Sequence, residues 1–374
     1  MKWWGSTILL VPVIYDLISL CLLRRFRDRR DPVPRSFPPV SILKPLKGGD
    51  GRTFDNLSTV AELDYPIYQI VLVVASPDDP AVPLARRLIR EFPHREISLV
   101  IDSTIHGANP KVSSLINAFE HCRHDIIALS DADVRLDADY LARVAGWFDD
   151  PSVGLVTSLY RHPDPVGLAG NLESLILDTE MIPNVIVAER VEGVTFALGA
   201  SMVVRRSALD SIGGFRALAD FLADDYQLGN LIHRNGWRVV LSRATVSLSQ
   251  GFETIGDFLR RHLRWGRTMR VSRPGGYLAS GVTRFSVMGV AALTLSGGDP
   301  EILLTGIPLY LLHLALLSLI RLSVGGRVSL YHLLLLPLRD ILSGLFWGGA
   351  FIGDRIVWRG ERYRLGRDGR LEKG

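Results

Sequence analysis

Two aspartates placed one residue apart form the most reactive pattern in the chain. Asp131 and Asp133 directly follow an apolar run at residues 126–129. If that run is a strand, its period of two turns both carboxylates to the same side. Two carboxylates so placed can hold one Mg²⁺ or Mn²⁺ ion, whose remaining ligands are waters and the phosphates of a substrate. A turn or a helix cap uses the same residues, so the metal interpretation depends on what lies nearby.

Further lysines and carboxylates follow other strand-like segments. Strands are predicted at residues 40–43, 69–75, 97–101 and 126–129, with helical patterns between them at 55–63, 81–91 and 111–122. This alternation predicts an α/β fold with a mostly parallel sheet and helices on both faces. The residues that follow the strands include Lys44, Lys47, Asp79, Lys111 and Asp131. Because ligands bind at the carboxyl ends of such strands, we expect these side chains to surround a metal-bound nucleoside diphosphate.

A second pair of acids, Asp224 and Asp225, opens the helical pattern of residues 224–237. Carboxylates suit a helix N-terminus, so two capping or solvated acids are one interpretation. In the other interpretation, one acid caps the helix while its neighbour acts as a general base. Spacing alone favours the first.

Residues 254–273 form an amphipathic helical pattern that includes Arg261, Arg264 and Trp265. A guanidinium on this helix suits a diphosphate, and the indole suits the face of a sugar or a lipid. A surface helix that binds anionic lipid explains the same pattern equally well.

The composition points to a membrane and excludes several classes of protein. The 374 residues are 47% hydrophobic and 22% charged, the mean hydropathy is +0.20, and the net charge is +4. So small a charge excludes a polyelectrolyte binder, and we expect no nucleic-acid partner. The two cysteines exclude a disulfide framework. No metal-protease, zinc-ribbon, P-loop or serine-hydrolase motif occurs, so zinc, P-loop and nucleophilic serine chemistry lack support.

The first apolar segment predicts an N-terminal anchor. Residues 3–23 are long enough to cross a bilayer, and a cluster of arginines follows from Arg24 to Arg30. The charge lies after the apolar run, which favours a signal anchor over a cleaved signal peptide. The same charge places the following domain in the cytoplasm.

Apolar segments near the other end predict further membrane contact. Residues 302–320 form the clearest span, whereas residues 286–297 are short. Residues 328–352 contain Arg339 and Asp340, which favour a re-entrant or interfacial segment over a simple span.

A set of motifs in consistent order identifies a family resemblance. The motifs are LKPLKG, ELDYP, DDPA, NPK, SDADVR, LADDYQLG and RHLRW, with WRGERYRL near the C-terminus. Together they resemble the membrane glycosyltransferases of the ceramide glucosyltransferase family, a branch of the GT-A group. The bacterial hopanoid-lipid glycosyltransferases look closely similar. The implied order is an anchor (1–23), a basic proline-containing linker (24–38), a GT-A domain (39–253), an amphipathic interfacial helix (254–276), a C-terminal membrane region (282–353) and a basic cytoplasmic tail (354–374).

The resemblance also assigns expected roles to single residues. The family's three separated aspartates fall on Asp79, Asp131 and Asp225, and its (Gln/Arg)-x-x-Arg-Trp motif falls on residues 261–265. This implies that Asp225 is the catalytic base and that Asp131 and Asp133 bind Mg²⁺ or Mn²⁺. The implied donor-binding residues are Lys44, Lys47, Asp79, Lys111 and Asp131, and the residues implied to close over the diphosphate and acceptor are Arg261, Arg264 and Trp265.

One departure from the family is visible. Animal ceramide glucosyltransferases generally have Asp-Ser-Gly at the second aspartate, whereas this chain has Asp131-Ala132-Asp133. The departure favours metal ligation through Asp133 and leaves the ceramide-specific branch open.

The implied function is an inverting transfer of a sugar, glucose in the ceramide branch, from a UDP-sugar to the hydroxyl of a ceramide-like lipid. The reaction is expected on the cytoplasmic face of a membrane, a bacterial inner membrane in our interpretation. The nearest alternative is a hopanoid-lipid N-acetylglucosaminyltransferase. A processive polysaccharide synthase, which would carry Gln at position 261 and more spans, is a weaker alternative. A non-catalytic membrane scaffold is another, but it would lack one or more of the acids.

Overall fold

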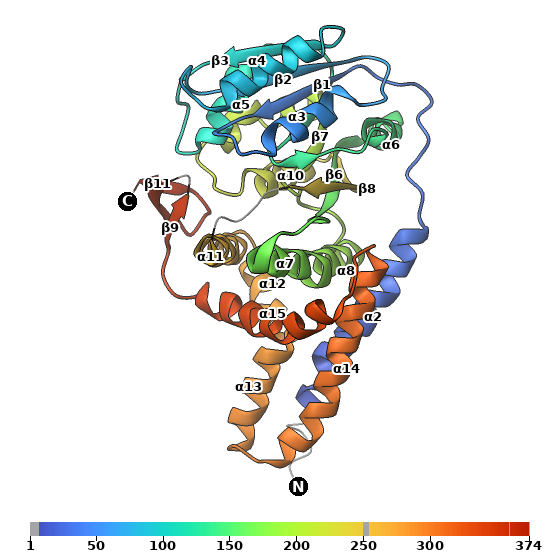
Figure 1. Ribbon diagram of the computed structural model, residues 1–374, viewed down its shortest axis with the longest axis vertical. Coiled ribbons are helices and arrows are strands. Elements are labelled where there is room, and N and C mark those ends of the chain that lie inside the picture. Colours follow the sequence, from blue (N-terminus) through green and yellow to red (C-terminus); the bar gives the residue numbers. More distant parts are fainter. Residues whose placement is uncertain (1–6, 250–253, 359, 374) are drawn as a thin grey trace.

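The molecule is built in layers, with an α/β domain at one end and long apolar helices at the other (Figure 1). The computed structural model describes residues 7–249, 254–358 and 360–373. Between the two ends lies a layer of helices that includes α7 (Gly167–Ile176), α8 (Ile182–Glu192), α11 (Ile255–Ser272) and α15 (Leu330–Gly349). This middle layer separates the sheet from the apolar end.

The α/β domain is organised around an eight-stranded sheet in the order β3-β2-β1-β4-β7-β6-β8-β5. Its strands are β1 (Val40–Pro45), β2 (Tyr68–Val74), β3 (Glu96–Ile101), β4 (Ile126–Ser130), β5 (Val134–Arg135), β6 (Val153–Arg161), β7 (Ser201–Arg205) and β8 (Arg238–Leu248). β1 to β4 pair in parallel, as predicted, whereas β7 runs antiparallel to both β4 and β6. The sheet is therefore mixed but mostly parallel.

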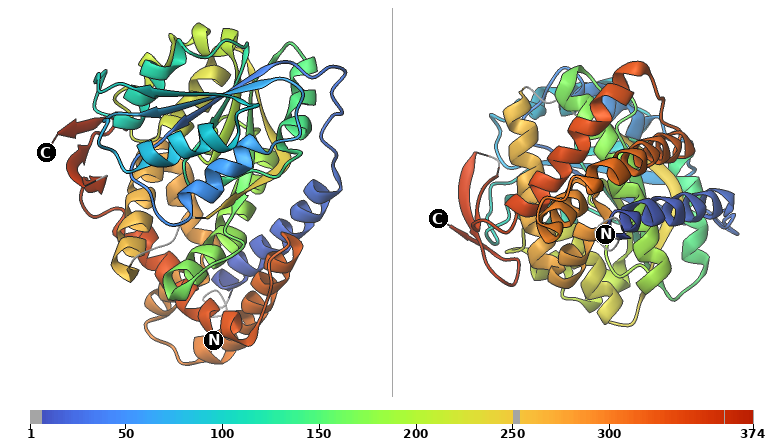
Figure 2. Two further views of the ribbon diagram at one scale, coloured as in Figure 1. Left: turned by 45° about the horizontal axis from the view of Figure 1, so that its top comes forward. Right: turned by 90° about the horizontal axis from the view of Figure 1, so that it is seen from below.

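Helices cover both faces of this sheet, which explains why its central strands are apolar throughout. Every residue of β2 is buried, and successive residues contribute to different cores: Ile70 and Leu72 to one face, Val71 and Val73 to the other. The first face is covered by α3 (Thr53–Ala61) and α4 (Ala81–Glu91). The second is covered by α5 (Pro110–Phe119), α9 (Arg206–Ser211) and α10 (Asp224–Arg234), as Figure 2 lets the reader follow. The predicted helices are thus confirmed.

The apolar end contains one helix that is long and apolar enough to cross a membrane among the described residues. This is α14 (Glu301–Ser323), whose candidate window is only 28% buried. The pair formed by residues 274–283 and α13 (Phe285–Ser296) also passes as a broken unit with a bend of 78°. By length and composition, the prediction that residues 302–320 form the clearest span is confirmed.

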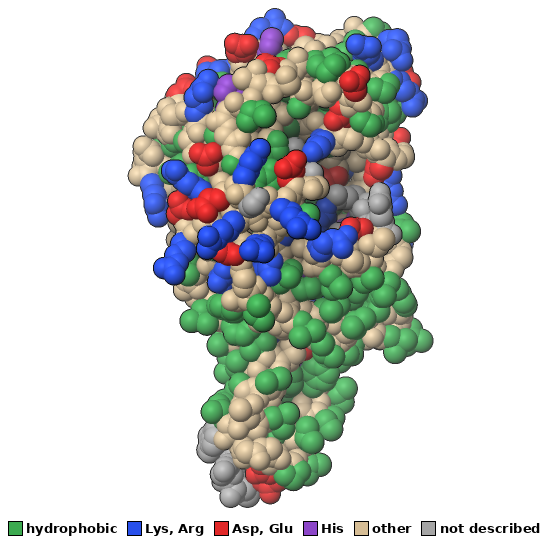
Figure 3. Space-filling model, turned by 90° about the vertical axis from the view of Figure 1, so that its left-hand side faces the viewer, with side chains coloured by type: hydrophobic (Ala, Val, Ile, Leu, Met, Phe, Trp, Pro, Cys, Tyr) green, Lys and Arg blue, Asp and Glu red, His purple; other side chains and the backbone are tan. Residues whose placement is uncertain are grey.

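The N-terminal segment forms the helix α2 (Leu10–Asp28), which packs against α14 and α8. It does not meet the same length and composition test, and residues 1–6 of the expected anchor lie outside the described chain. Transmembrane helices at both ends are therefore not established. Its residues Ile14, Leu17 and Ile18 are nevertheless exposed. Figure 3 shows an apolar surface at this end of the molecule, below a band of Lys and Arg side chains.

Two C-terminal segments, α15 and the basic tail, are neither a simple membrane span nor an extended tail. α15 crosses beneath α7 and α11 instead of running along α14, and it buries Arg339 and Asp340, as an interfacial segment would. The basic tail folds into an antiparallel sheet of β9 (Arg355–Trp358), β10 (Glu361–Leu365) and β11 (Leu371–Lys373). The backbone N–H of Leu371 donates to the carbonyl of Asp220 at 2.7 Å, so the tail is anchored just before α10.

Candidate active site

The loop that carries Asp131 and Asp133 rests on a buried lysine. The register pairs Leu43 with Leu129, so Lys44 reaches the residues that follow β4. Its ammonium group donates to the Ser130 hydroxyl at 3.1 Å and to the carbonyls of Asp131 at 2.7 Å and Val134 at 3.3 Å. Burial lowers the pKa of Lys44 to about 8, although Asp131 and Asp133 act in the opposite direction.

This geometry corrects the expected role of Lys44. The side chain is fully buried, and its three N–H groups are matched by three acceptors of the protein. No donor atom is left over for a nucleotide sugar, so Lys44 holds the aspartate loop from below. Lys47, by contrast, is exposed after the end of β1.

The other side of the aspartate loop is also held. The amide of Asn56 in α3 donates to the carbonyl of Ala132 at 3.4 Å, and the backbone N–H of Ser249 donates to the carbonyl of Asp133 at 2.9 Å. A hollow of about 200 Å³ lies beside these contacts, lined in part by Arg52 and Arg135. The loop is therefore preformed next to open space.

Lys111 brings the two acidic regions of the sequence together. Its ammonium group lies 2.7 Å from Asp131 Oδ1 and 3.4 Å from Asp224 Oδ2. Burial alone would lower the pKa of Lys111, but Asp131 and Asp224 outweigh that effect and raise it, so the amine is charged. Asn109 caps α5 and donates to the carbonyl of Phe221 at 2.7 Å, which fixes the start of α5 beside the segment that leads into α10.

Asp225 belongs to the same acidic cluster and is partly buried. Burial and the neighbouring Asp224 raise the pKa of Asp225 to about 6, with Lys111 acting in the opposite direction. One carboxylate oxygen of Asp225 accepts from the backbone N–H of Tyr226 at 2.8 Å. A carboxylate with a pKa near neutrality is well matched to proton transfer.

Gly199 makes room for the Asp225 carboxylate. A Cβ atom built at Gly199 would lie 2.7 Å from Asp225 Oδ2, which is closer than Cβ atoms come to other heavy atoms in proteins. Gly199→Ala should therefore displace this carboxylate and reduce transfer about 100-fold, since small misplacements of catalytic groups carry costs of that order. The measurement is the initial rate of sugar transfer by the purified variant.

Gly289→Ala provides the matched control, because a Cβ at Gly289 meets nothing within 4 Å. It should transfer sugar at close to the wild-type rate. Equal rates for the two variants would show that the space at Gly199 is not needed.

A divalent cation fits the aspartate loop only with help from a substrate. Burial and Asp131 raise the pKa of Asp133, while Arg261 partly offsets them. A cation between the two carboxylates would relieve this repulsion. Among the described residues no group of three or more His, Cys, Asp or Glu side chains could hold a metal ion. Two carboxylates completed by phosphates are the usual arrangement for Mg²⁺.

Asp79 lies just before α4, two residues ahead of the first residue of the helix. One oxygen of its carboxylate accepts from the N–H of Ala81 at 2.9 Å, at the start of α4, and from the N–H of Gly48 at 2.8 Å. The residue therefore joins the ends of β1 and β2, where the expected donor site begins.

The helix α11 carries the arginine and tryptophan motif toward the aspartates. Thr254 and Asp257 form a capping box that fixes its first turn. Trp265 packs against the same core cluster as Ala132 and Tyr160, and the Arg261 guanidinium lies 5.7 Å from the Trp265 ring. The amphipathic helix expected over residues 254–276 is thus observed, broken near Arg273 before the short helix α12 (Pro274–Ala279).

The amino-acid sequence matches a known family along almost its whole length. The model of glycosyl transferase family 21 matches residues 6–371. The chain belongs to glycosyl transferase family 21. Ceramide glucosyltransferase 1 of Caenorhabditis elegans is 24% identical over 377 residues, which cover 98% of this chain and 79% of that protein. Ceramide glucosyltransferase 3 of the same organism is 23% identical and covers 90% of this chain and 74% of its own length.

A solved structure supports the fold assignment of this family 21 enzyme. The mannosyltransferase PcManGT from Pyrobaculum calidifontis, in complex with GDP-Man and Mn²⁺, aligns with a TM-score of 0.57 at 18% identity. The alignment covers 94% of this chain and 98% of that chain. The expected GT-A-like fold is confirmed, and the family relationship confirms a hexosyltransferase of the ceramide glucosyltransferase family.

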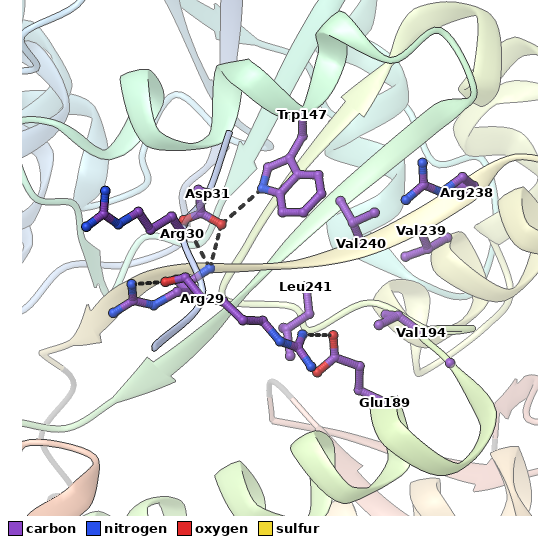
Figure 4. A pocket seen from close by; sticks show the side chains of 12 residues that line it. Arg29, Arg30, Asp31, Trp147, Glu189, Val194, Arg238, Val239, Val240 and Leu241 are labelled. Carbon is purple, nitrogen blue, oxygen red and sulfur yellow. Dashed lines mark hydrogen bonds and ion pairs between the residues drawn. The ribbon is translucent and has the colours of Figure 1, made fainter. Parts of the chain in front are cut away.

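Another hollow of the family 21 enzyme lies elsewhere. It has a volume of about 290 Å³ and lies beside the first half of β8, with Arg29, Arg30 and Arg243 around it (Figure 4). β8 is parallel to β6, and β6 and β4 both run antiparallel to β7, so the hollow is far from the end of β4 that carries the aspartates. Its carboxylates are engaged, since Glu189 pairs with Arg29 at 2.5 Å and Asp31 accepts from Trp147.

The sequence did not predict two residues of the candidate active site, which lie beside the arginine and tryptophan motif. Glu173 lies in the apolar run of α7 and is only 2% exposed, and His262 stands beside Arg261 but is only 6% exposed. A single acid among apolar residues was the available signal, because such an acid is rarely buried without a partner. That partner, His262, lies 89 residues further along the chain.

Proposed function

We propose that this enzyme transfers a hexose, glucose in the first instance, from a UDP-sugar to the hydroxyl of a ceramide-like lipid, with inversion at the anomeric carbon. The observation that carries the proposal is the partly buried cluster of Asp131, Lys111, Asp224 and Asp225 above an apolar helical end. The names of the ceramide glucosyltransferase relatives support the lipid and the sugar. The complex of PcManGT supports a nucleotide diphosphate sugar and a divalent cation.

In this mechanism Asp225 accepts the proton of the lipid hydroxyl as its oxygen attacks the anomeric carbon. Direct attack on the face opposite the leaving diphosphate inverts that carbon. Asp225 is partly buried, and the backbone N–H of Tyr226 holds its carboxylate before the acceptor arrives. The ammonium of Lys111 keeps Asp131 and Asp224 in place and offsets their negative charge.

The leaving nucleoside diphosphate is expected to lie at the aspartate loop. Asp131 and Asp133 would hold Mg²⁺ or Mn²⁺, which supplies Lewis-acid stabilisation of the charge that develops on the diphosphate. Lys47 and Asp79 border the nucleoside side of this site, after β1 and β2. Arg261, Arg264 and Trp265 would close over the diphosphate and the acceptor from α11.

The membrane arrangement follows from the same layers. The band of Lys and Arg side chains lies between the α/β domain and the apolar end (Figure 3). Basic residues concentrate on the cytoplasmic side of membrane proteins. We therefore place the α/β domain in the cytoplasm and the apolar end in the bilayer, with the acceptor entering along α7 and α11.

The direct test is a panel of labelled donors, UDP-glucose, UDP-N-acetylglucosamine and GDP-mannose, incubated with membranes that contain the full chain. Ceramide and a hopanoid lipid are supplied as acceptors, and products are separated by lipid chromatography. Labelled glucosylceramide is the expected product. A labelled hopanoid with N-acetylglucosamine would replace the proposal by its nearest alternative, and the absence of any labelled lipid would contradict both.

The pKa of Asp225 predicts a pH dependence. A general base works only when it is ionised, so transfer should be weak below pH of about 6 and rise to a plateau above it. The measurement is the initial rate at saturating substrates, in buffers of constant ionic strength. A rate that does not change between pH of about 5 and pH of about 8 would contradict the assignment of Asp225.

A further inference from the structure

A buried acid joins the middle helical layer to the arginine helix. Glu173 of α7 accepts a hydrogen bond from His262 of α11, and both side chains are almost completely buried. The His262 ring stacks on Phe346 of α15, with centroids 5.1 Å apart and planes at 18°, and it meets the Trp265 ring at 5.3 Å. Glu173 is therefore held at the junction of three helices, next to the arginine and tryptophan motif.

The second oxygen of Glu173 faces Arg261. Glu173 Oε1 lies 4.0 Å from Arg261 Nη1, and it has no hydrogen-bond partner among the described residues. Burial alone would raise the pKa of Glu173, but His262 and Arg261 outweigh that effect and lower it, so the group is a carboxylate. A buried carboxylate with one unbonded oxygen costs free energy that an apolar residue would not cost. Stability alone therefore does not account for Glu173.

Arg261 also lies beside the tryptophan of its own motif. Its guanidinium is 5.7 Å from the Trp265 ring, and Trp265 packs against the same core cluster as Ala132, the residue between the two aspartates of the loop. Arg261 thus has the Glu173 carboxylate and the Trp265 ring beside it.

We propose that Glu173 is a positioning residue that orients Arg261 toward the leaving diphosphate. This proposal rests on the proposed function. Without the Glu173 charge, the guanidinium of Arg261 would lose the buried carboxylate that lies 4.0 Å away, and its orientation would be less fixed. His262 keeps the Glu173 carboxylate turned toward Arg261.

The test is a double-mutant cycle on the full chain in lipid nanodiscs, with Glu173→Gln, Arg261→Gln and both together. Glu173→Gln keeps the shape and a hydrogen bond to His262 but removes the charge. It should lower kcat about tenfold, and it should have little further effect in the Arg261→Gln background. The same cost in both backgrounds would overturn the proposal.

Asp178→Asn is the matched control. Asp178 is a fully buried acid just after α7, and it pairs with Arg161 of β6 at 2.9 Å and with Arg321 of α14 at 3.4 Å, two residues that lie outside α11. Its effect should multiply with that of Arg261→Gln, because the two sites are independent. Coupling as large as that of Glu173 would show a general loosening of the helical layer and would also overturn the proposal.

Thermal unfolding of the same proteins separates failure of this proposal from failure of the proposed function. If the wild type transfers no sugar from any donor, the proposed function is wrong. The double-mutant cycle is then measured as the changes in unfolding temperature of the same variants. Coupling between Glu173 and Arg261 in that measurement supports the ion pair, and strict additivity excludes it. If Glu173→Gln does not fold, Glu173→Asp replaces it in the cycle. This variant keeps the charge but moves it away from Arg261, so it should lower kcat less in the Arg261→Gln background than in the wild type. Equal effects in the two backgrounds would overturn the proposal.

Discussion

Replacing Asp225 with asparagine should reduce sugar transfer by about 10² to 10⁴, the usual contribution of a general base. Asparagine keeps the size of the side chain and its hydrogen bond from Tyr226, but it cannot accept the proton of the attacking hydroxyl. Binding of the nucleotide sugar should change by no more than about twofold, because the donor is held at the aspartate loop. The measurements are the transfer rate and the donor affinity by calorimetry.

Asp224→Asn is the control for this prediction, since Asp224 opens the same helical turn and lies 3.4 Å from Lys111. It removes a charge that raises the pKa of Asp225, so the acid limb of the pH profile should move to lower pH while transfer persists. If Asp225→Asn transfers sugar at close to the wild-type rate, the base is another residue.

Replacing Asp133 with asparagine should remove most of the metal-dependent rate. The variant retains one carboxylate of the pair, and the loss of Lewis-acid stabilisation should lower transfer about 100-fold or more. Lys44 and Ser249 bond to backbone carbonyls of the loop, so the loop itself should keep its shape. The measurement is the rate as a function of Mg²⁺ or Mn²⁺ concentration.

Chelation provides the independent arm of the same prediction. Excess EDTA should bring the wild type down to the rate of the Asp133→Asn variant and should have little effect on the variant itself. Asp139→Asn, a substitution in an exposed surface pair with Arg143, should respond to EDTA as the wild type does. Undiminished wild-type transfer in EDTA would remove Asp131 and Asp133 as metal ligands.

Local patterns predicted the first half of the α/β domain well. Strands β1 to β4 and helices α3 to α5 follow directly from short β-branched runs and helical periodicity, and their bounds differ from the expected ones by a few residues. β6, β7 and β8 were not predicted. β7 takes antiparallel partners from β4 and β6, and such long-range pairing leaves little trace in a five-residue segment.

The candidate site was predicted only in part from the sequence. Asp131, Asp133 and Lys111 follow strands whose carboxyl ends meet, so their proximity is a consequence of the parallel sheet. The donor-binding role expected for Lys44 does not fit the structure, because a lysine at the end of a strand is usually exposed and this one is buried. Only the pairing of β1 with β4 shows that its amine is enclosed by the backbone of the aspartate loop.

The sequence by itself determined the chemical types in this enzyme and their order: two acidic pairs, the lysines after the strands, an arginine helix and apolar ends. These are properties of local spacing, which periodicity and composition carry. The tertiary structure decided which groups share a charge environment. Lys111 lies between Asp131 and Asp224, and Glu173 faces Arg261, although Lys111 and Asp224 are 113 positions apart in the chain and Glu173 and Arg261 are 88 apart. Burial and charge act through space, so pKa values and ion pairs depend on the packed helices and sheet and not on neighbours in sequence.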